Sequence, residues 1–268
     1  MTATRTYSMR IATDDRMLVS IDDFTIAPGR ITVLLGESGI GKSLIAKTLY
    51  GLLDPDELTV TINGMPYRTY LGLPETRKLQ EQSFFVFQEP STHLHPLLTL
   101  QEQLNEGSLA AAPHQQEILQ RLWQGAGAGA VESLLPVYPK PYRPSGGEKQ
   151  RMLIAMAFKK MDLVIEGNRT ENALFVFDEP SGSLDNFYRD VFLDMLFERY
   201  RRCRCTILLI THDYSMIGMI HQLYPALLSQ MTFKELMLVH DGVRLRDFEP
   251  REYLQWRDSL RPIPSFHG

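Results

Sequence analysis

The sequence contains few cysteines, no long hydrophobic run and no excess of positive charge. Its 268 residues include 2 cysteines, Cys203 and Cys205, which excludes a disulfide framework and fits a reducing cytosol. Apolar runs such as Met152–Phe158 fall far short of the about 18 residues that span a bilayer, so we expect neither a membrane span nor a signal peptide. The net charge of −4 argues against a general nucleic-acid binder, and we expect no nucleic-acid partner.

The composition is that of an ordinary globular chain. Hydrophobic residues make up 44%, aromatic residues 10% and charged residues 22% of the sequence, which excludes disorder, collagen and coiled coil as descriptions of the whole chain. A chain of this length can form one large α/β domain, or a core that carries a smaller insert. No linker separates a second domain, so we expect a single domain over residues 1–268.

Buried strands alternate with helices along the chain. Four short apolar runs predict buried strands: Ile31–Leu35, Phe84–Phe87, Leu174–Phe177 and Thr206–Ile210. The intervening segments predict helices, including Leu44–Leu52 and Asn186–Arg202, and a strand is expected within Met17–Ala27. A hairpin over Leu236–Phe248 with a turn at Asp241-Gly242, and a helix over Pro250–Leu260, close the chain. This order predicts an α/β fold with a mostly parallel sheet covered on both faces.

A mostly helical insert is predicted over approximately residues 90–160. Helical stretches at Leu98–Glu106 and His114–Gln124 are followed by small residues and then by repeated prolines up to Pro144. Ser145 and Glu148 have the spacing of a capping box, which predicts the start of a helix that continues to about Met161.

A phosphate-binding loop follows the first buried strand and precedes a helix. Its pattern is G-x-x-x-x-G-K-[ST], formed by Gly36, Glu37, Ser38, Gly39, Ile40, Gly41, Lys42 and Ser43. Backbone N–H groups of such a loop face a phosphate, and the following helix adds its positive end. Lys42 then supplies a charge for the β- and γ-phosphates, and Ser43 a hydroxyl for Mg²⁺. The strand–loop–helix context disfavours a chance glycine-rich turn.

A pair of carboxylates follows the strand Leu174–Phe177. Asp178 is expected to hold Mg²⁺, and Glu179 to polarise an attacking water. By itself the pattern also fits a strand that ends in solvated acids; the phosphate-binding loop upstream favours the catalytic interpretation. Ligands bind at this carboxyl edge in open α/β sheets.

Further motifs complete a resemblance to the ATP-binding cassette (ABC) ATPases. The stretch 145–151 (SGGEKQR) resembles the signature motif of that family, and Gln88 lies in a segment that resembles its Q-loop. Ser183-Leu184-Asp185 is similar to the D-loop, and His212 resembles the switch histidine. The order of the motifs is that of the family. Locally, Phe87–Thr99 is similar to the oligopeptide/dipeptide importer branch.

The resemblance implies a fold, a nucleotide and partners. The fold is that of a P-loop NTPase of the ABC type, with an N-terminal antiparallel β part and the inserted helical subdomain. ATP and Mg²⁺ are the implied cofactors. Ser145, Gly146, Gly147 and Glu148 are expected to meet the γ-phosphate bound by a second cassette, with Asp185 at the same interface. Gln88 is expected to sense Mg²⁺ and water, and His212 to contact the γ-phosphate.

Three features depart from the family pattern. Pro144 stands where the family usually has leucine, directly before the signature helix. The region around Arg10–Thr13 has no aromatic ring to stack on adenine, and Tyr7 is the nearest candidate. The segment between signature and carboxylate pair is about ten residues longer than usual, and we expect the extra residues in a polar surface loop at Asp162–Asn172. Separately, a basic run is predicted to be a solvated helix end, at Arg199, Arg201, Arg202 and Arg204.

Two functions remain open from the sequence. The first is the ATP-binding subunit of a bacterial ABC transporter, which hydrolyses ATP as a dimer of cassettes and powers separate transmembrane permease subunits. It would be cytoplasmic and peripheral on the inner membrane, in contact with the bilayer only through its partner. The alternative is a soluble ABC-type ATPase that remodels a protein or nucleic-acid complex without a permease. A P-loop kinase is excluded by the signature and the D-loop.

Overall fold

The computed structural model describes residues 4–139, 143–170, 173–240 and 242–259. Two sheets are formed, one of four strands in the order β2-β1-β4-β5 and one of six in the order β10-β9-β3-β8-β7-β6. The strands are β1 (Arg5–Ala12), β2 (Met17–Ile26), β3 (Ile31–Gly36), β4 (Thr59–Ile62), β5 (Met65–Pro66), β6 (Phe84–Val86), β7 (Leu174–Asp178), β8 (Thr206–Thr211), β9 (Met231–Val239) and β10 (Gly242–Asp247).

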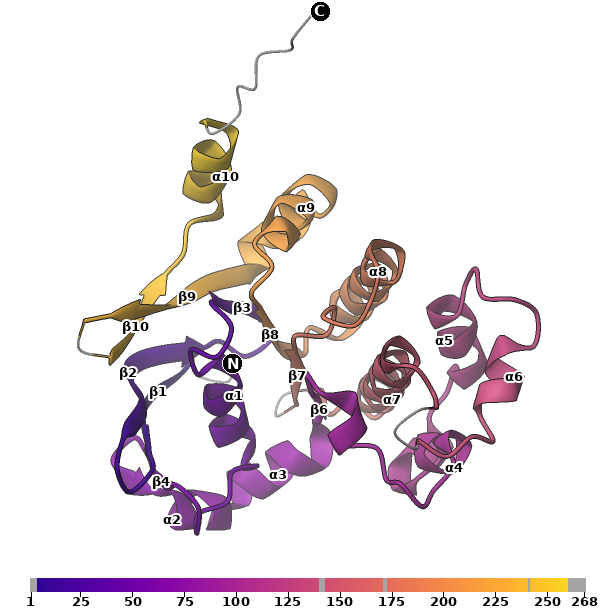
Figure 1. Ribbon diagram of the computed structural model, residues 1–268, viewed down its shortest axis with the longest axis horizontal. Coiled ribbons are helices and arrows are strands. Elements are labelled where there is room, and N and C mark those ends of the chain that lie inside the picture. Colours follow the sequence, from indigo (N-terminus) through magenta and orange to yellow (C-terminus); the bar gives the residue numbers. More distant parts are fainter. Residues whose placement is uncertain (1–3, 140–142, 171–172, 241, 260–268) are drawn as a thin grey trace, which may run out of the picture.

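The helices surround the larger sheet and form a separate group at one side of the molecule (Figure 1). Their bounds are α1 (Lys42–Tyr50), α2 (Tyr67–Gly72), α3 (Pro74–Gln82), α4 (Leu100–Leu104), α5 (Gln115–Leu122), α6 (Ala130–Leu134), α7 (Gly146–Glu166), α8 (Asn186–Cys203), α9 (Ser215–Leu223) and α10 (Pro250–Ser259), with 3₁₀ turns η1 (Pro90–Thr92), η2 (Gly107–Ala111) and η4 (Pro225–Gln230).

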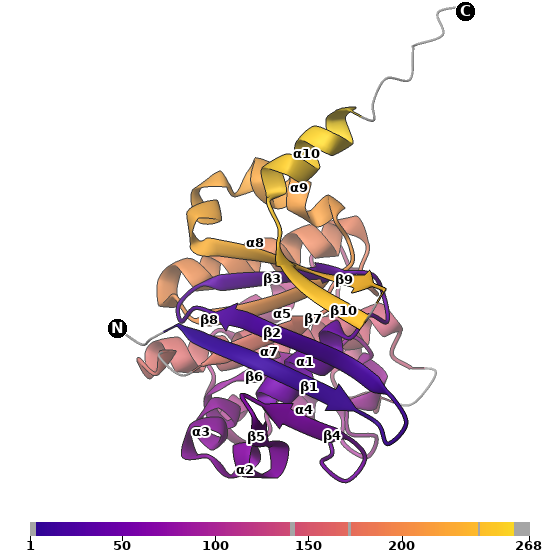
Figure 2. The ribbon, with the colours of Figure 1, turned by 90° about the vertical axis from the view of Figure 1, so that its left-hand side faces the viewer.

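The predicted α/β architecture is confirmed. Strands β9, β3, β8, β7 and β6 run parallel, and β10 pairs antiparallel with β9. The smaller sheet is antiparallel and lies over the larger one, as the two views show (Figures 1 and 2). Of the predicted turn at Asp241-Gly242 and the helix over Pro250–Leu260, Asp241 and Leu260 lie outside the described residues.

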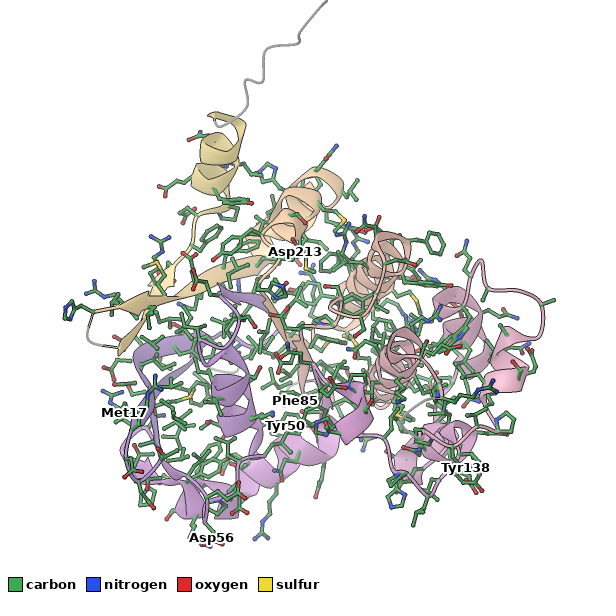
Figure 3. All side chains as sticks on the ribbon, in the orientation of Figure 1. Met17, Tyr50, Asp56, Phe85, Tyr138 and Asp213 are labelled. Atoms are coloured by element: carbon green, nitrogen blue, oxygen red, sulfur yellow. The ribbon has the colours of Figure 1, made fainter. Side chains whose placement is uncertain are left out.

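Successive residues of the central strands face different cores because strand side chains alternate. Val33 and Leu35 of β3 pack with α7 and α8, whereas Leu34 packs with α1 and the antiparallel sheet. In the second core, Tyr50 of α1 meets Phe85 of β6 edge to face, with ring centroids 5.5 Å apart (Figure 3). Burial on both faces explains the continuous apolar runs that predicted these strands.

Two expectations about polar segments are wrong in part. The segment Asp162–Asn172 is not a surface loop throughout, because α7 continues to Glu166 and Asp162 is 1% exposed. Its carboxylate lies 3.0 Å from a guanidinium nitrogen of Arg199, which is 4% exposed and stacks on the ring of Phe158. Arg199 is therefore not part of a solvated helix end, whereas Arg201, Arg202 and Arg204 are exposed at the end of α8, as predicted. Asn172 lies outside the described residues.

Candidate functional site

The loop between β3 and α1 has a backbone that favours glycine at Gly36, Gly39 and Gly41, and at two of these positions a Cβ would also clash. Gly36 has φ +147°, and a Cβ there would lie 2.6 Å from the carbonyl oxygen of Leu236. Gly41 has φ +112°, and its Cβ would lie 2.5 Å from a methyl group of Val19. Glycine therefore lets β3 turn sharply into the N-terminus of α1, where free N–H groups favour an anion.

Lys42 is buried at the base of this loop. Its Nζ donates hydrogen bonds to the carbonyl oxygens of Gly36 and Glu37, each at 2.8 Å, and lies 3.5 Å from Oε1 of Glu179. Burial lowers the pKa of Lys42, and the nearby Glu179 carboxylate opposes that shift. The ammonium group is thus a charge on a buried side chain that lines the loop's cavity, where electrostatic attraction to phosphate is stronger than in bulk water.

Glu179 connects the loop to the end of β8. Its carboxylate oxygen Oε2 lies 2.8 Å from Nδ1 of His212, and its backbone N–H donates to Ile210 in β8 at 3.0 Å. The residue is 5% exposed and has a left-handed backbone, with φ 48°. Such a conformation is costly for a residue with a side chain and clusters at functional sites. The structure therefore brings together Lys42, Glu179 and His212.

One carboxylate oxygen of Asp178 has no hydrogen-bond donor among the described residues. This atom, Oδ1, is buried. Burial raises the pKa of the carboxyl, and the Ser43 hydroxyl that hydrogen-bonds to it opposes that shift. A carboxylate oxygen without a hydrogen-bond partner, next to a serine hydroxyl, provides the oxygen ligands that Mg²⁺ prefers. The residues present therefore fit the expected ion.

A cavity of about 160 Å³ contains most of the predicted nucleotide-site residues. Glu179 and the exposed Gln88 meet the phosphate-binding loop there; the loop residues in the lining are Ser38, Gly39, Gly41, Lys42, Ser43 and Leu44. Gly36 lies at the base of the loop, and Glu37 is exposed at its start. The cavity thus collects residues from the ends of β3, β6 and β7 at one edge of the sheet.

The signature segment forms the N-terminus of α7 and lies outside the lining of this cavity. Ser145 caps α7: its hydroxyl accepts from the N–H of Glu148, and the Glu148 side chain accepts from the backbone N–H of Ser145. A Cβ on Gly147 would lie 2.9 Å from the carbonyl oxygen of Ser183. The capping box is confirmed. Asp185 caps α8 by accepting from the N–H of Tyr188.

Tyr7 does not lie at the nucleotide site. It belongs to β1 and lines a hollow with Leu174 and Thr206, the first residues of β7 and β8. The phosphate-binding loop follows the opposite, carboxyl ends of the same parallel strands. The choice of Tyr7 as the adenine-stacking residue is therefore wrong, because proximity in sequence placed it at the wrong edge of the sheet.

Two contacts between the Q-loop and the signature helix were not predicted. Nζ of Lys149 donates to the Ser91 hydroxyl at 3.1 Å, and Nε2 of Gln150 donates to the carbonyl of Phe87 at 3.3 Å. Both side chains are buried, although lysine is rarely fully buried. Both residues stand in the SGGEKQR stretch, but nothing in the sequence pairs them with the Q-loop.

Comparison with known proteins gives the same family. The family model described as ABC transporter matches residues 19–166. The oligopeptide transport ATP-binding protein OppD of Salmonella typhimurium is 31% identical over 77% of this chain and 61% of its own length. The peptidoglycan transport ATP-binding protein YejF of Agrobacterium fabrum is 31% identical over 74% of this chain and 36% of its own. The dipeptide transport ATP-binding protein DppD of Bacillus subtilis is 30% identical over 74% of this chain and 58% of its own length.

Solved structures share the fold. An ATP-binding subunit of an ABC transporter superposes with a TM-score of 0.59 at 23% identity, covering 97% of this chain and 95% of that one. A bacterial Atm1-family ABC exporter with ATP bound superposes with a TM-score of 0.62 at 20% identity. The superposition covers 98% of this chain and 44% of that one. The chain spans between about a third and two thirds of the length of the curated relatives named above. The family match includes the phosphate-binding loop, the Q-loop and the signature helix, and it shows that the chain belongs to the ABC transporter family.

Proposed function

We propose that this chain is the ATP-binding and ATP-hydrolysing subunit of an ABC transporter and powers a separate membrane permease. The observation that carries the proposal is the Glu179 carboxylate, which lies between Lys42 and His212 at the cavity of the phosphate-binding loop. The relatives' names, which describe transport ATP-binding proteins, favour this function over a soluble remodelling ATPase.

In the proposed reaction, Lys42 exchanges partners. The ammonium group now contacts two carbonyl oxygens and Glu179. The β- and γ-phosphates of ATP compete for the same ammonium, so phosphate binding frees Glu179 from its contact with Lys42. Glu179 can then polarise the attacking water, while His212 contacts the γ-phosphate.

Mg²⁺ would be held by Asp178, Ser43 and Gln88. When bound, the ion neutralises charge on the β- and γ-phosphate oxygens. Asp178 contributes its open Oδ1 acceptor, and Gln88 reaches the site from the segment that follows β6. The phosphate-binding loop from Gly36 to Ser43, including Glu37, Ser38, Gly39, Ile40 and Gly41, surrounds the phosphates with N–H groups.

The proposal requires two cassettes, of the same or homologous chains. Ser145, Gly146, Gly147 and Glu148 form the N-terminus of α7, a site for an anion that lies outside the lining of this chain's own loop cavity. A γ-phosphate bound by a second cassette would satisfy it, with Asp185 at the same interface. ATP would therefore hold the cassettes together.

The permease would be another polypeptide. Among the described residues, no helix is both long and apolar enough to cross a bilayer. From the relatives' names, we propose one cassette over residues 1–268, with the helical insert at approximately 90–160, bound to the cytoplasmic face of the inner membrane through transmembrane partners. No nucleic-acid partner is proposed.

Co-purification combined with ATPase measurement tests this function. A tagged chain, isolated from detergent-solubilised membranes, should carry a polytopic membrane protein and hydrolyse ATP. The same complex made with Lys42→Ala should retain the membrane partner and lose hydrolysis. Absence of any polytopic partner would favour the soluble alternative, and equal hydrolysis by both complexes would refute the assigned site.

A further inference from the structure

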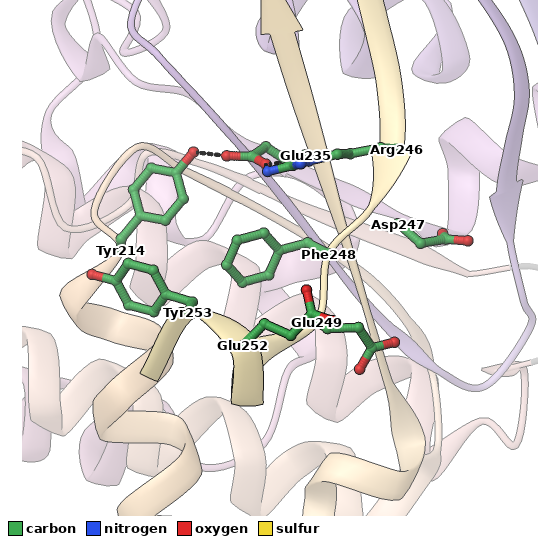
Figure 4. A pocket seen from close by; sticks show the side chains of 8 residues that line it. All are labelled: Tyr214, Glu235, Arg246, Asp247, Phe248, Glu249, Glu252 and Tyr253. Carbon is green, nitrogen blue, oxygen red and sulfur yellow. Dashed lines mark hydrogen bonds and ion pairs between the residues drawn. The ribbon is translucent and has the colours of Figure 1, made fainter. Parts of the chain in front are cut away.

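A second and larger cavity lies between the C-terminal hairpin and α10. Its volume is about 600 Å³, within the range of small-molecule sites. Three aromatic rings form one wall, those of Tyr214, Phe248 and Tyr253 (Figure 4). Their centroids are 5.5–5.9 Å apart, so each ring contacts the other two. The wall is therefore a continuous aromatic surface.

The rest of the lining is acidic. Glu235 and Asp247 line the cavity together with Glu249 and Glu252, and Arg246 is the basic residue among the lining residues that the structure describes. A positive charge near an aromatic face is attracted by the ring, and carboxylates add to that attraction. The combination of aromatic rings and carboxylates favours binding of a cation over binding of an anion or a neutral molecule.

Two of these carboxylates already have cationic or hydrogen-bonding partners. Glu235 accepts from the hydroxyl of Tyr214 and pairs with Arg246. Burial and Glu235 both raise the pKa of the Tyr214 hydroxyl, which therefore remains a donor. Asp247 pairs with Lys234 at 2.8 Å.

Two other carboxylates remain uncompensated. No side-chain hydrogen bond or ion pair joins Glu249 or Glu252 to another residue in the part of the chain that the structure describes. Both stand at the start of α10, where the positive end of a helix stabilises a negative charge. Among the described residues, Glu249 and Glu252 are therefore the two carboxyl groups of the cavity that have no side-chain partner.

We infer that this cavity binds an organic cation, with a guanidinium or ammonium group on an apolar body. The apolar body packs on the rings of Tyr214, Phe248 and Tyr253, and the charged group faces Glu249 and Glu252. Such a group can come from a free small molecule or from a basic side chain of another protein. This inference does not depend on the proposed function, because none of these residues lines the nucleotide cavity.

Calorimetry on the full chain tests the inference with probes of matched shape. Butylguanidinium and neutral N-butylurea have the same outline but differ in charge. At low ionic strength we expect saturable binding of butylguanidinium and at least about tenfold weaker binding of N-butylurea. A capped Ala-Arg-Ala peptide and its citrulline counterpart repeat the comparison for a protein-borne group. Binding of the arginine peptide without butylguanidinium identifies a protein source, and the reverse identifies a free molecule.

Variants place the binding in this cavity. Glu249→Gln combined with Glu252→Gln removes two exposed charges, so the fold is preserved, and should weaken binding about tenfold. The control combines Glu81→Gln and Glu132→Gln, exposed glutamates on α3 and α6, and should bind like the original chain. Failure of both cationic probes to bind, equal binding of the neutral probes, or unchanged binding by the first double variant would overturn the inference.

Discussion

Glu179→Gln is the most informative substitution in this chain. The amide keeps the size of the side chain, and the left-handed backbone at φ 48° is as costly for glutamine as for glutamate. The fold should therefore be unaffected. What changes is the charge of a group that is 5% exposed and lies 2.8 Å from His212 and 3.5 Å from Lys42.

The expected effect on turnover follows from the loss of a general base. Such a loss costs about 10²–10⁴-fold in rate, equivalent to about 3–5.5 kcal/mol of activation free energy. ATP binding should be equal or tighter, because in the unmutated chain the Glu179 carboxylate competes with phosphate for the Lys42 ammonium. Slow hydrolysis with intact binding should make the ATP-bound dimer of cassettes accumulate.

Single-turnover hydrolysis with the membrane partner present is the appropriate assay. Glu81→Gln, an exposed glutamate on α3, provides the charge-matched control and should turn over normally. Turnover by Glu179→Gln within about threefold of the control would refute the reasoning, because a lost general base costs far more than that. Glu179 would then be a structural residue at the end of β7.

Four further results are expected. Lys42→Ala should weaken ATP binding about tenfold or more in calorimetry, since a charged hydrogen bond is lost; unchanged affinity would contradict the loop assignment. Gly146→Asp should preserve ATP binding but prevent ATP-dependent dimerisation in sedimentation, because the nearest atoms to a new Cβ are 3.9 Å away and the fold has room for the negative charge. Arg199→Met should lower the free energy of unfolding by about 3–5 kcal/mol in denaturant titrations, because the buried Asp162 carboxylate loses its cationic partner. The double variant Arg199→Met, Asp162→Leu should recover much of this loss, because it also removes the carboxylate. Burial lowers the pKa of Lys159 to about 8, so between about pH 8 and 10 the unfolded chain binds more protons at this group than the folded chain does. The free energy of unfolding should therefore increase as the pH rises from about 8 to 10. Lys159→Met should remove this increase.

Local chemistry determined the features that the sequence predicted correctly. The loop at Gly36–Ser43 depends on glycines whose backbone angles other residues adopt with strain, so its pattern is visible without any tertiary contact. The capping box of Ser145 and Glu148 joins residues three positions apart. Strands buried on both faces have continuous apolar runs, which identified β3, β7 and β8.

Contacts between distant segments required the tertiary structure. Glu179 and His212 meet only because β7 and β8 are neighbours in a parallel sheet, and Asp162 is buried because α7 and α8 pack together. Tyr7 is close to the phosphate-binding loop in sequence, yet it lies at the opposite edge of the sheet. The aromatic and acidic cavity joins the residue that precedes α9, the C-terminal hairpin and α10, and no short-range pattern marks it. Sequence alone thus determined conformations set within a few residues, whereas the sheet order and helix packing decided which side chains share a site.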